Sequence, residues 1–128
     1  MSADVREIVT EYVHAVGDRR FDRFEELLHP EVEFGGTTVA ELRGASVVAE
    51  GYRRLGPIVL RNDIKELVVD GDRAAVLYDF VTDTEAKAVL TAEFLTIEDG
   101  SIRSITLLFD WRAWPTVLEE LQRRTPSG

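Results

Sequence analysis

Apolar residues recur at helical spacing in the first half of the chain. The pattern predicts an amphipathic helix over residues 3–17, ending at Gly17. Its apolar stripe consists of Val5, Ile8, Val9, Tyr12, Val13 and Val16. A second stripe predicts a short helix over about 21–28, closed by Pro30. Residues 46–55, "SVVAEGYRRL", predict a third helix with Ser46 as its N-cap.

After about residue 60, the spacing of apolar residues changes to two, which is the period of a strand. A short strand, "EVEF", already precedes Gly35-Gly36. Two pairs of longer strands follow, hinged at Asp70-Gly71-Asp72 and at Glu98-Asp99-Gly100, and a last helix covers about 115–124. Helices followed by a strand meander predict an α+β fold, in which a curved antiparallel sheet wraps around the N-terminal helices.

Length and composition narrow the possible functions. The 128 residues predict a single domain over 1–128, and no apolar run approaches a membrane span. A net charge of −9, from 24 acidic and 15 basic residues, argues against nucleic-acid binding. Because cysteine is absent, disulfides and thiolate metal sites are excluded, and a cytoplasmic location is the simplest expectation. The two histidines, His14 and His29, are too few for most zinc sites, so we expect neither metal nor cofactor.

The order of these elements resembles the SnoaL-like branch of the nuclear transport factor 2-like superfamily. Residues 11–34, "EYVHAVGDRRFDRFEELLHPEVEF", look like the opening helix pair and first strand of that family, and residues 98–114, "EDGSIRSITLLFDWRAW", look like its closing hairpin. The resemblance implies a cone in which sheet and helices enclose an apolar pocket, often in homodimers. Members include ketosteroid isomerases, polyketide cyclases, limonene epoxide hydrolases and proteins without chemistry, so the fold alone does not choose a function.

Alignment with the isomerases supplies a first set of candidate site residues. Those enzymes hold a developing enolate oxygen with a tyrosine and an acid, and the resemblance places Tyr12 and Glu93 at these positions. Burial would keep Glu93 protonated and able to donate a hydrogen bond beside Tyr12. Gly36 stands where the proton-shuttling aspartate should be, so half of the acid–base pair is absent. Tyr12 also lies on an apolar stripe, where the alternative is a core tyrosine with a satisfied hydroxyl.

Asp79 is the remaining candidate for the base. It shares a strand face with Ala75, Leu77 and Val81, an apolar setting that would raise its pKa if that face were buried. The sequence leaves open the alternative that Asp79 points outward and that the core face consists of Val76, Tyr78 and Phe80. Folding the hairpin at "TDTEA" places Asp79 opposite about Val89, roughly 13 Å from Glu93 at ~3.3 Å per residue, so the two acids form no dyad.

The polar residues of the epoxide hydrolases are lost or changed at the aligned positions. Phe34 and Gly36 stand where those enzymes hold the water, and the last catalytic acid falls on Leu107. On the fourth strand the aligned positions are Asp79 and Val81, without the required arginine. Epoxide hydrolysis by that mechanism is therefore disfavoured.

Asp110 interrupts the apolar end of the last strand. Strand alternation places Ile105, Leu107, Phe109 and Trp111 on one face, which by the resemblance is the pocket face. Asp110 then points the other way. We interpret it as structural, either accepting amide hydrogens from "WRAW" or pairing with Arg112.

These observations predict a homodimeric domain with a pocket for a small apolar organic ligand. The expected pocket walls are Phe34, Tyr52, Leu77, Leu107, Phe109 and Trp111, and the expected polar points are Tyr12, Asp79 and Glu93. The enzyme hypothesis is cofactor-independent proton transfer next to a carbonyl, as in an isomerase or cyclase, with Tyr12 and Glu93 holding the oxyanion and Asp79 as base. The alternatives are a binding module without turnover and a purely structural dimer with a filled core.

Overall fold

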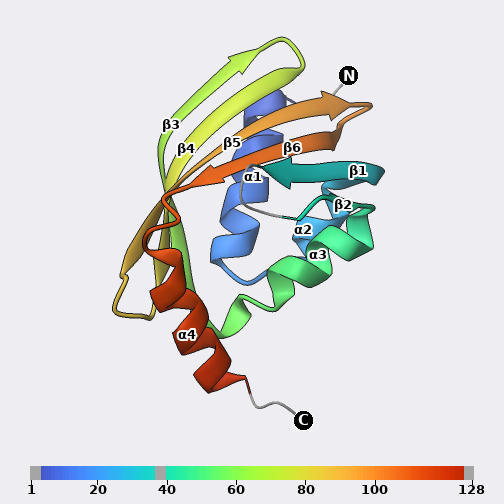
Figure 1. Cartoon of the computed structure of the whole chain (residues 1–128). Helices are drawn as coiled ribbons and strands as arrows, with labels where there is room; N and C mark the ends of the chain where they lie inside the picture. The colour runs from blue at the N-terminus through green and yellow to red at the C-terminus, as the bar shows by residue number, and fades with distance from the viewer. Residues whose placement is uncertain (1–3, 37–39, 126–128) are drawn as a thin grey trace.

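The computed structural model of the protein describes residues 4–36 and 40–125 (Figure 1). Its helices are α1 (Val5–Gly17), α2 (Phe21–Glu26), α3 (Ala45–Arg53) and α4 (Trp114–Arg124), with a short 3-10 helix η1 (Gly56–Ile58). Its strands are β1 (Leu28–Gly36), β2 (Leu42–Arg43), β3 (Val59–Asp70), β4 (Arg73–Thr82), β5 (Ala88–Glu98) and β6 (Ser101–Phe109). Within these two ranges, no helix is both long enough and apolar enough to cross a membrane.

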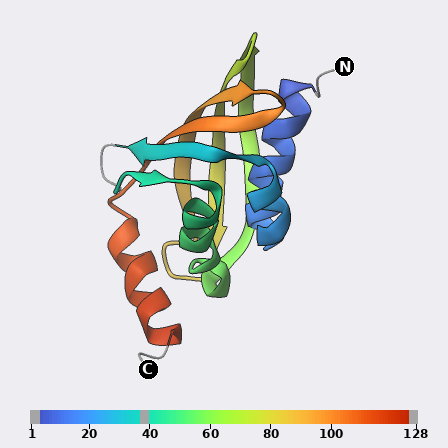
Figure 2. The same cartoon turned by 90° about the vertical axis from the view of Figure 1, so that its right-hand side faces the viewer.

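The six strands form one curved, unclosed sheet in the order β2-β1-β6-β5-β4-β3. The helix α1 lies against its concave face, closest to β3 and β4 (Figures 1 and 2). This arrangement confirms the predicted α+β class. One pairing differs from the prediction, because β1 and β6 run parallel. The long connection between these two strands, through α3 and the meander, allows a parallel pairing that a tight hairpin would forbid.

The first helix is held by its cap and by its buried stripe. The side chain of Asp4 accepts a hydrogen bond from the amide of Arg6, which caps the helix N-terminus. The buried residues of α1 are Ile8, Val9, Tyr12, Val13, Ala15, Val16 and Gly17. A Cβ on Gly17 would lie 2.5 Å from the backbone nitrogen of Asn62, so only glycine permits this close approach of α1 to β3.

Both predicted hinges are tight turns that join neighbouring antiparallel strands. Gly71 lies between β3 and β4 with a φ of +63°, and Asp99 and Gly100 link β5 to β6 with φ of +53° and +78°. In the β5–β6 turn, positive φ at both central residues matches the twist of the flanking strands, which is why Asp-Gly is favoured there. In the β3–β4 turn, glycine supplies the positive φ at the first central position, before Asp72. These two turns fix the register of the meander locally.

Element boundaries differ from the predictions around Pro30. The second helix ends at Glu26, and the strand that follows already begins at Leu28, so Pro30 lies inside β1 rather than after a helix. Pro30 is exposed and lies where the β1–β6 pairing is irregular, between Leu28 and Glu33. The missing backbone N–H of proline therefore costs no regular ladder hydrogen bond at this position.

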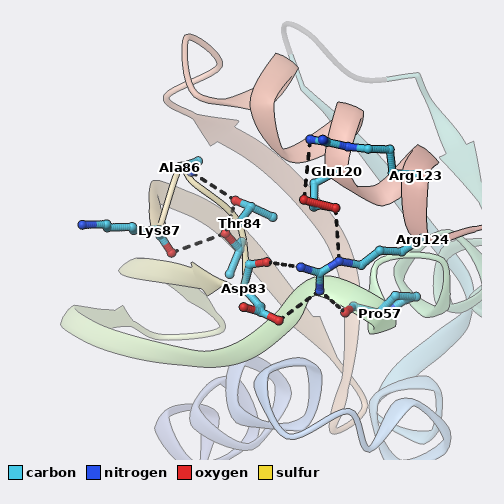
Figure 3. Close-up of polar contacts among 9 residues, drawn as sticks. Pro57, Asp83, Thr84, Ala86, Lys87, Glu120, Arg123 and Arg124 are labelled. Carbon is cyan, nitrogen blue, oxygen red and sulfur yellow. Dashed lines mark hydrogen bonds and ion pairs between the residues drawn. The ribbon is translucent and has the colours of Figure 1, made fainter.

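The last helix is fastened at its C-terminal end by Arg124 (Figure 3). This guanidinium donates to the carboxylate of Asp83 at 3.0 Å and to its carbonyl at 2.8 Å. It also donates to the carbonyl of Pro57 at 3.3 Å and is flanked by Glu120 of the same helix. The end of α4 is thereby tied to η1 and to the loop between β4 and β5.

Candidate functional site

The inner face of the sheet carries a buried polar cluster on three elements. The hydroxyl of Tyr12, from α1, donates to Oε1 of Glu93 at 2.5 Å. The hydroxyl of Tyr78, from β4, donates to Oε2 of the same carboxyl group at 2.5 Å. Glu93 lies on β5 and is 1% exposed, so both of its oxygens meet protein donors rather than solvent. The sequence-predicted pair of Tyr12 and Glu93 is therefore brought together, with Tyr78 as a third member that the prediction missed.

Burial and hydrogen bonding act in opposite directions on this carboxyl group. Desolvation raises the pKa of Glu93, while the hydrogen bonds from Tyr12 and Tyr78 lower it, and the net pKa lies above the usual value. The pKa values of Tyr12 and Tyr78 are raised well above that of a free tyrosine, first by burial and then by the charge of Glu93. Both tyrosines accordingly keep their protons and serve as donors.

An apolar cavity of about 240 Å³ lies beside this cluster, between the sheet and the helices α3 and α4. Apolar surface dominates its lining. The lining residues are Phe34, Leu42, Val48, Gly51, Tyr52, Leu55, Tyr78, Phe80, Val89, Thr91, Leu107, Phe109 and Trp114. Neither Tyr12 nor Glu93 belongs to this lining, so Tyr78 separates the carboxyl group from the cavity. The pair expected to hold an oxyanion is thus turned inward onto its own hydrogen bonds.

Tyr52, on α3, brings a third tyrosine hydroxyl to the same region. Its ring packs against Phe24 and Phe34, with ring centroids 4.8 Å and 6.0 Å apart. Its hydroxyl oxygen is buried and has no hydrogen-bond partner among the described residues. The Tyr52 pKa is raised well above its usual value, first by burial and then by Glu93, with a smaller opposing effect from Tyr12. Tyr12 is thus close, but no hydrogen bond of good geometry joins the two hydroxyls.

Four of the six residues predicted as pocket walls line this cavity: Phe34, Tyr52, Leu107 and Phe109. The other two do not. Leu77 lies on the outer face, because its strand neighbours Val76 and Tyr78 point inward. Trp111 is 60% exposed, because β6 ends at Phe109 and the chain then turns.

Trp114 takes the place that the sequence predicted for Trp111. It is the first residue of α4, it lines the cavity, and its ring lies 5.2 Å from that of Phe109. The sequence signal for this change is the turn between Asp110 and Pro115. A strand cannot continue through it, so alternation no longer assigns Trp111 to a face.

Asp79 does not face the cavity, which corrects its prediction as a base in the pocket. It pairs across the sheet with Leu90 rather than with Val89, and its carboxylate lies 3.3 Å from Nζ of Lys65 on the outer face. Residues directly opposite each other in an antiparallel pair share a face, so a shift of one residue in register moves a side chain to the other side. The alternative left open by the sequence, with Val76, Tyr78 and Phe80 as the core face, describes the structure.

Asp110 has the structural contacts expected of it. Its carboxylate accepts from the amide of Arg112 at 3.2 Å and from the guanidinium of the same residue at 3.0 Å. These hydrogen bonds with Arg112 lower the pKa of Asp110. The carboxylate orders the turn that leads from β6 into α4, and it takes no part in the lining of the cavity.

Three other hollows on the surface are larger, and polar groups make up a greater part of their lining than in the apolar cavity. One, of about 720 Å³, lies along β1, β2 and β6, the second, of about 580 Å³, lies between α2 and the start of α3, and the third, of about 370 Å³, crosses strands β3 to β6. The second is bordered by Asp22, Glu25 and Glu26. Across residues 4–36 and 40–125, no group of three or more acidic or histidine side chains is arranged to hold a metal ion. The apolar cavity beside Tyr78 is therefore the candidate binding site.

An α+β fold in which a curved sheet covers a helix and leaves a cavity at its concave face is that of the nuclear transport factor 2-like class of proteins. A profile of the SnoaL-like domain matches residues 9–105, and the chain belongs to this family. No curated protein matches the chain significantly.

Solved structures with the same fold have been assigned different activities. A protein from Kribbella flavida, provisionally assigned as a ketosteroid isomerase, has a TM-score of 0.73 at 20% identity, over 83% of this chain and 77% of its own. A provisionally assigned polyketide cyclase from Sinorhizobium meliloti has a TM-score of 0.69 at 22% identity, over 80% and 94%. An LEH-like epoxide hydrolase from M. tuberculosis has a TM-score of 0.74 at 17% identity, over 95% and 92%. At these identities the likeness establishes the fold alone.

Proposed function

We propose that the protein binds a small apolar organic molecule in the cavity beside Tyr52 and Tyr78. The observation that carries this proposal is a hollow of about 240 Å³ whose lining is almost entirely aliphatic and aromatic. Its three hydroxyl-bearing residues are Tyr52, Tyr78 and Thr91. A concave apolar site with a few polar groups is the usual form of a small-molecule site.

Binding without turnover is favoured over proton transfer because the described residues that line the cavity supply no base. None of them is Asp, Glu, His or Lys. Asp79 lies on the other face of the sheet, and Glu93 has both oxygens engaged by tyrosines. General acid–base catalysis needs a titratable group within hydrogen-bond reach of the reacting atom.

Isomerase or cyclase chemistry is the second candidate, and one observation favours it. Glu93 is a carboxyl group with a raised pKa, hydrogen-bonded to two tyrosines on the cavity side of the sheet. Movement of Tyr78 would open a path from this acid to a bound carbonyl. The structural neighbours provisionally assigned as an isomerase and a cyclase support this second candidate.

Calorimetric titration with ethylbenzene tests the binding proposal. The wild type is expected to bind with a measurable heat, and Leu107→Trp, which places an indole into the cavity, is expected to lose at least tenfold in affinity. Asp79→Asn, on the outer face, is the matched control and retains wild-type binding. Equal affinity of the wild type and Leu107→Trp, or no binding to either, contradicts the proposal.

Deuterium exchange distinguishes the two candidate functions. The methyl protons of acetophenone lie next to its carbonyl, so a proton-transfer enzyme that binds this ketone would accelerate their exchange in D₂O. The binding proposal predicts the same rate with and without protein. Acceleration that Glu93→Gln abolishes would instead establish the catalytic function.

We also propose that the protein forms a homodimer through the outer face of its sheet. Three large apolar side chains are exposed there on neighbouring positions of β5 and β6: Leu90 (45%), Phe94 (53%) and Leu108 (37%). Contiguous exposed apolar surface of this kind is typical of interfaces.

Charges beside this apolar patch support a second copy as the partner. The ion pairs Arg61–Asp63 and Lys65–Asp79 border the patch on the side of β3, at 3.0 Å and 3.3 Å. These two ion pairs place both signs of charge beside the patch, although the whole chain has a net charge of −9. A two-fold interface brings a surface onto itself, and a border that carries both signs permits opposite charges to meet across it.

A further inference from the structure

A glycine interrupts the side of α3 that faces the cavity. The lining residues supplied by this helix and by the turn after it are Val48, Gly51, Tyr52 and Leu55. Their spacing of three, four and seven residues places them on one side of the helix. Three of these residues have large side chains, whereas Gly51, between them, has none.

The backbone of α3 does not require a glycine at this position. Gly51 lies inside a helix, where glycine is among the least favourable residues and alanine is the most favourable. A Cβ on Gly51 would meet Cδ1 of Leu42 at 3.8 Å, which is an ordinary van der Waals contact. Gly17 differs, because a Cβ there would lie 2.5 Å from the backbone nitrogen of Asn62. Close packing therefore explains Gly17 and leaves Gly51 unexplained.

The missing side chain of Gly51 enlarges the cavity. Leu42, whose Cδ1 a Cβ at this position would contact, is itself part of the cavity lining. A side chain at position 51 would therefore extend into the hollow, on the same side of the helix as Val48 and Leu55. With glycine there, the cavity has a volume of about 240 Å³. Apolar cavities of about 150 Å³ bind benzene, so this cavity has room for more than a single ring.

We propose that Gly51 determines the size of the ligand, and that part of an apolar ligand larger than benzene lies against this residue. The proposal rests on the proposed binding function, and it adds the size of the ligand and the residue that sets this size. Aromatic side chains in the lining favour flat ligands, because rings stack on one another. These side chains include Phe34, Phe80, Phe109 and Trp114.

The stability of Gly51→Ala tests whether the glycine serves the fold or the cavity. A glycine required by packing or backbone geometry makes the protein less stable when it is replaced by alanine. Because Gly51 lies in a helix with room for a Cβ, we expect Gly51→Ala to unfold at a higher urea concentration than the wild type. A lower midpoint would assign Gly51 a structural role and overturn the proposal.

Two probes of different size test the effect on binding. Dissociation constants for benzene and naphthalene are measured by NMR titration of the wild type, Gly51→Leu and Glu50→Leu. Forcing extra atoms into a filled apolar site is costly, so Gly51→Leu should lose about tenfold in affinity for naphthalene and less than about threefold for benzene. Gly51→Ala should show the same order of losses, each smaller. Glu50→Leu adds the same side chain at the neighbouring exposed position of α3, outside the cavity lining, and should bind both probes like the wild type.

The outcomes separate this proposal from the binding function on which it rests. If both probes bind the wild type, and the substitutions at Gly51 weaken them equally or not at all, Gly51 does not determine ligand size. Selective loss of naphthalene binding in Glu50→Leu would also overturn the proposal, because the effect would then not arise inside the cavity. If neither probe binds the wild type, the proposed binding function itself fails.

Discussion

The two faces of β4 and β5 place similar residues in opposite environments. On the inner face, Glu93 is 1% exposed and accepts hydrogen bonds from two tyrosines. On the outer face, the side chain of Asp79 is 29% exposed and pairs with Lys65. Both are carboxylic acids on neighbouring strands. They differ because alternate residues of a strand point to opposite faces of the sheet. The chemical character of an acid in this sheet is thus decided by register rather than by residue type.

The apolar residues of β5 show the same contrast between a buried inner face and an exposed outer face. Leu95 is 2% exposed on the inner face, whereas the adjacent Phe94 is 53% exposed on the outer one. An antiparallel sheet with apolar residues on both sides needs a cover for each. The helix α1 and the cavity walls cover the inner face, and the outer face is available for a partner.

The largest expected difference between the two faces concerns stability. Glu93→Ala leaves the hydroxyls of Tyr12 and Tyr78 buried without an acceptor and should lower the free energy of unfolding by about 3 kcal/mol. Asp79→Ala removes one partly exposed ion pair and should cost less than about 1 kcal/mol. Urea unfolding of both variants measures the difference, and equal losses would show that the buried cluster is not a distinct source of stability.

Assembly is the next point at which the faces should differ. Phe94→Asp introduces a charge into the outer patch and should halve the mass measured by light scattering. Its helical circular dichroism should remain that of the wild type, because position 94 is half-exposed within the chain. Thr96→Asp, further along the same strand face and half-buried, serves as the control for a merely local effect. A wild type that is monomeric at all concentrations rules out the homodimer.

The pH dependence of stability follows from the raised pKa of Glu93. A group whose folded pKa exceeds its unfolded value near 4.5 stabilises the fold below that value, and the contribution is lost as the pH rises through the folded pKa. Glu93→Gln cannot titrate, so its free energy of unfolding should fall less than that of the wild type between pH 4.5 and 8. The difference between the two proteins amounts to about 1.4 kcal/mol for each pH unit by which the pKa of Glu93 is higher in the folded than in the unfolded state. Parallel pH profiles would show that burial does not dominate at this site.

The smallest expected effect separates two adjacent arginines of α4. Arg124→Ala breaks the links to Asp83 and Pro57 and should lower the free energy of unfolding slightly, with faster amide hydrogen exchange in α4. Arg123→Ala removes only a 3.5 Å ion pair to Glu120 of the same helix and should change neither quantity measurably (Figure 3). Similar exchange in both variants would mean that Arg124 does not fasten the helix.

The elements of the fold could be predicted because their signals are local. The stripe of α1 and the Asp-Gly turns depend on residues a few positions apart, and both are confirmed. The pairing of β1 with β6 joins residues about 70 positions apart in sequence, for example Phe34 with Ile105, and no local pattern specifies its direction.

The candidate site was less predictable than the fold, because the loop between β4 and β5 determines the register of these two strands. Residues 83–87 include Lys87 at a φ of +63°, and this irregular turn pairs Val81 with Ala88. A turn of this length does not fix a register from sequence, and one residue decides on which face Asp79 lies. The proximity of Tyr12 and Glu93 came from family resemblance, whereas Tyr78 could have been found from the alternation of Val76, Tyr78 and Phe80.

The most direct test of a ligand site on the inner face is an NMR titration of the isotope-labelled protein with ethylbenzene. We predict saturable shifts of the methyl groups that line the cavity, such as those of Val48, Val89 and Leu107, and no shifts for Leu90 and Leu108 on the outer face. Shifts confined to the outer leucines, or none at any soluble concentration, would contradict the assignment of the inner cavity as the binding site.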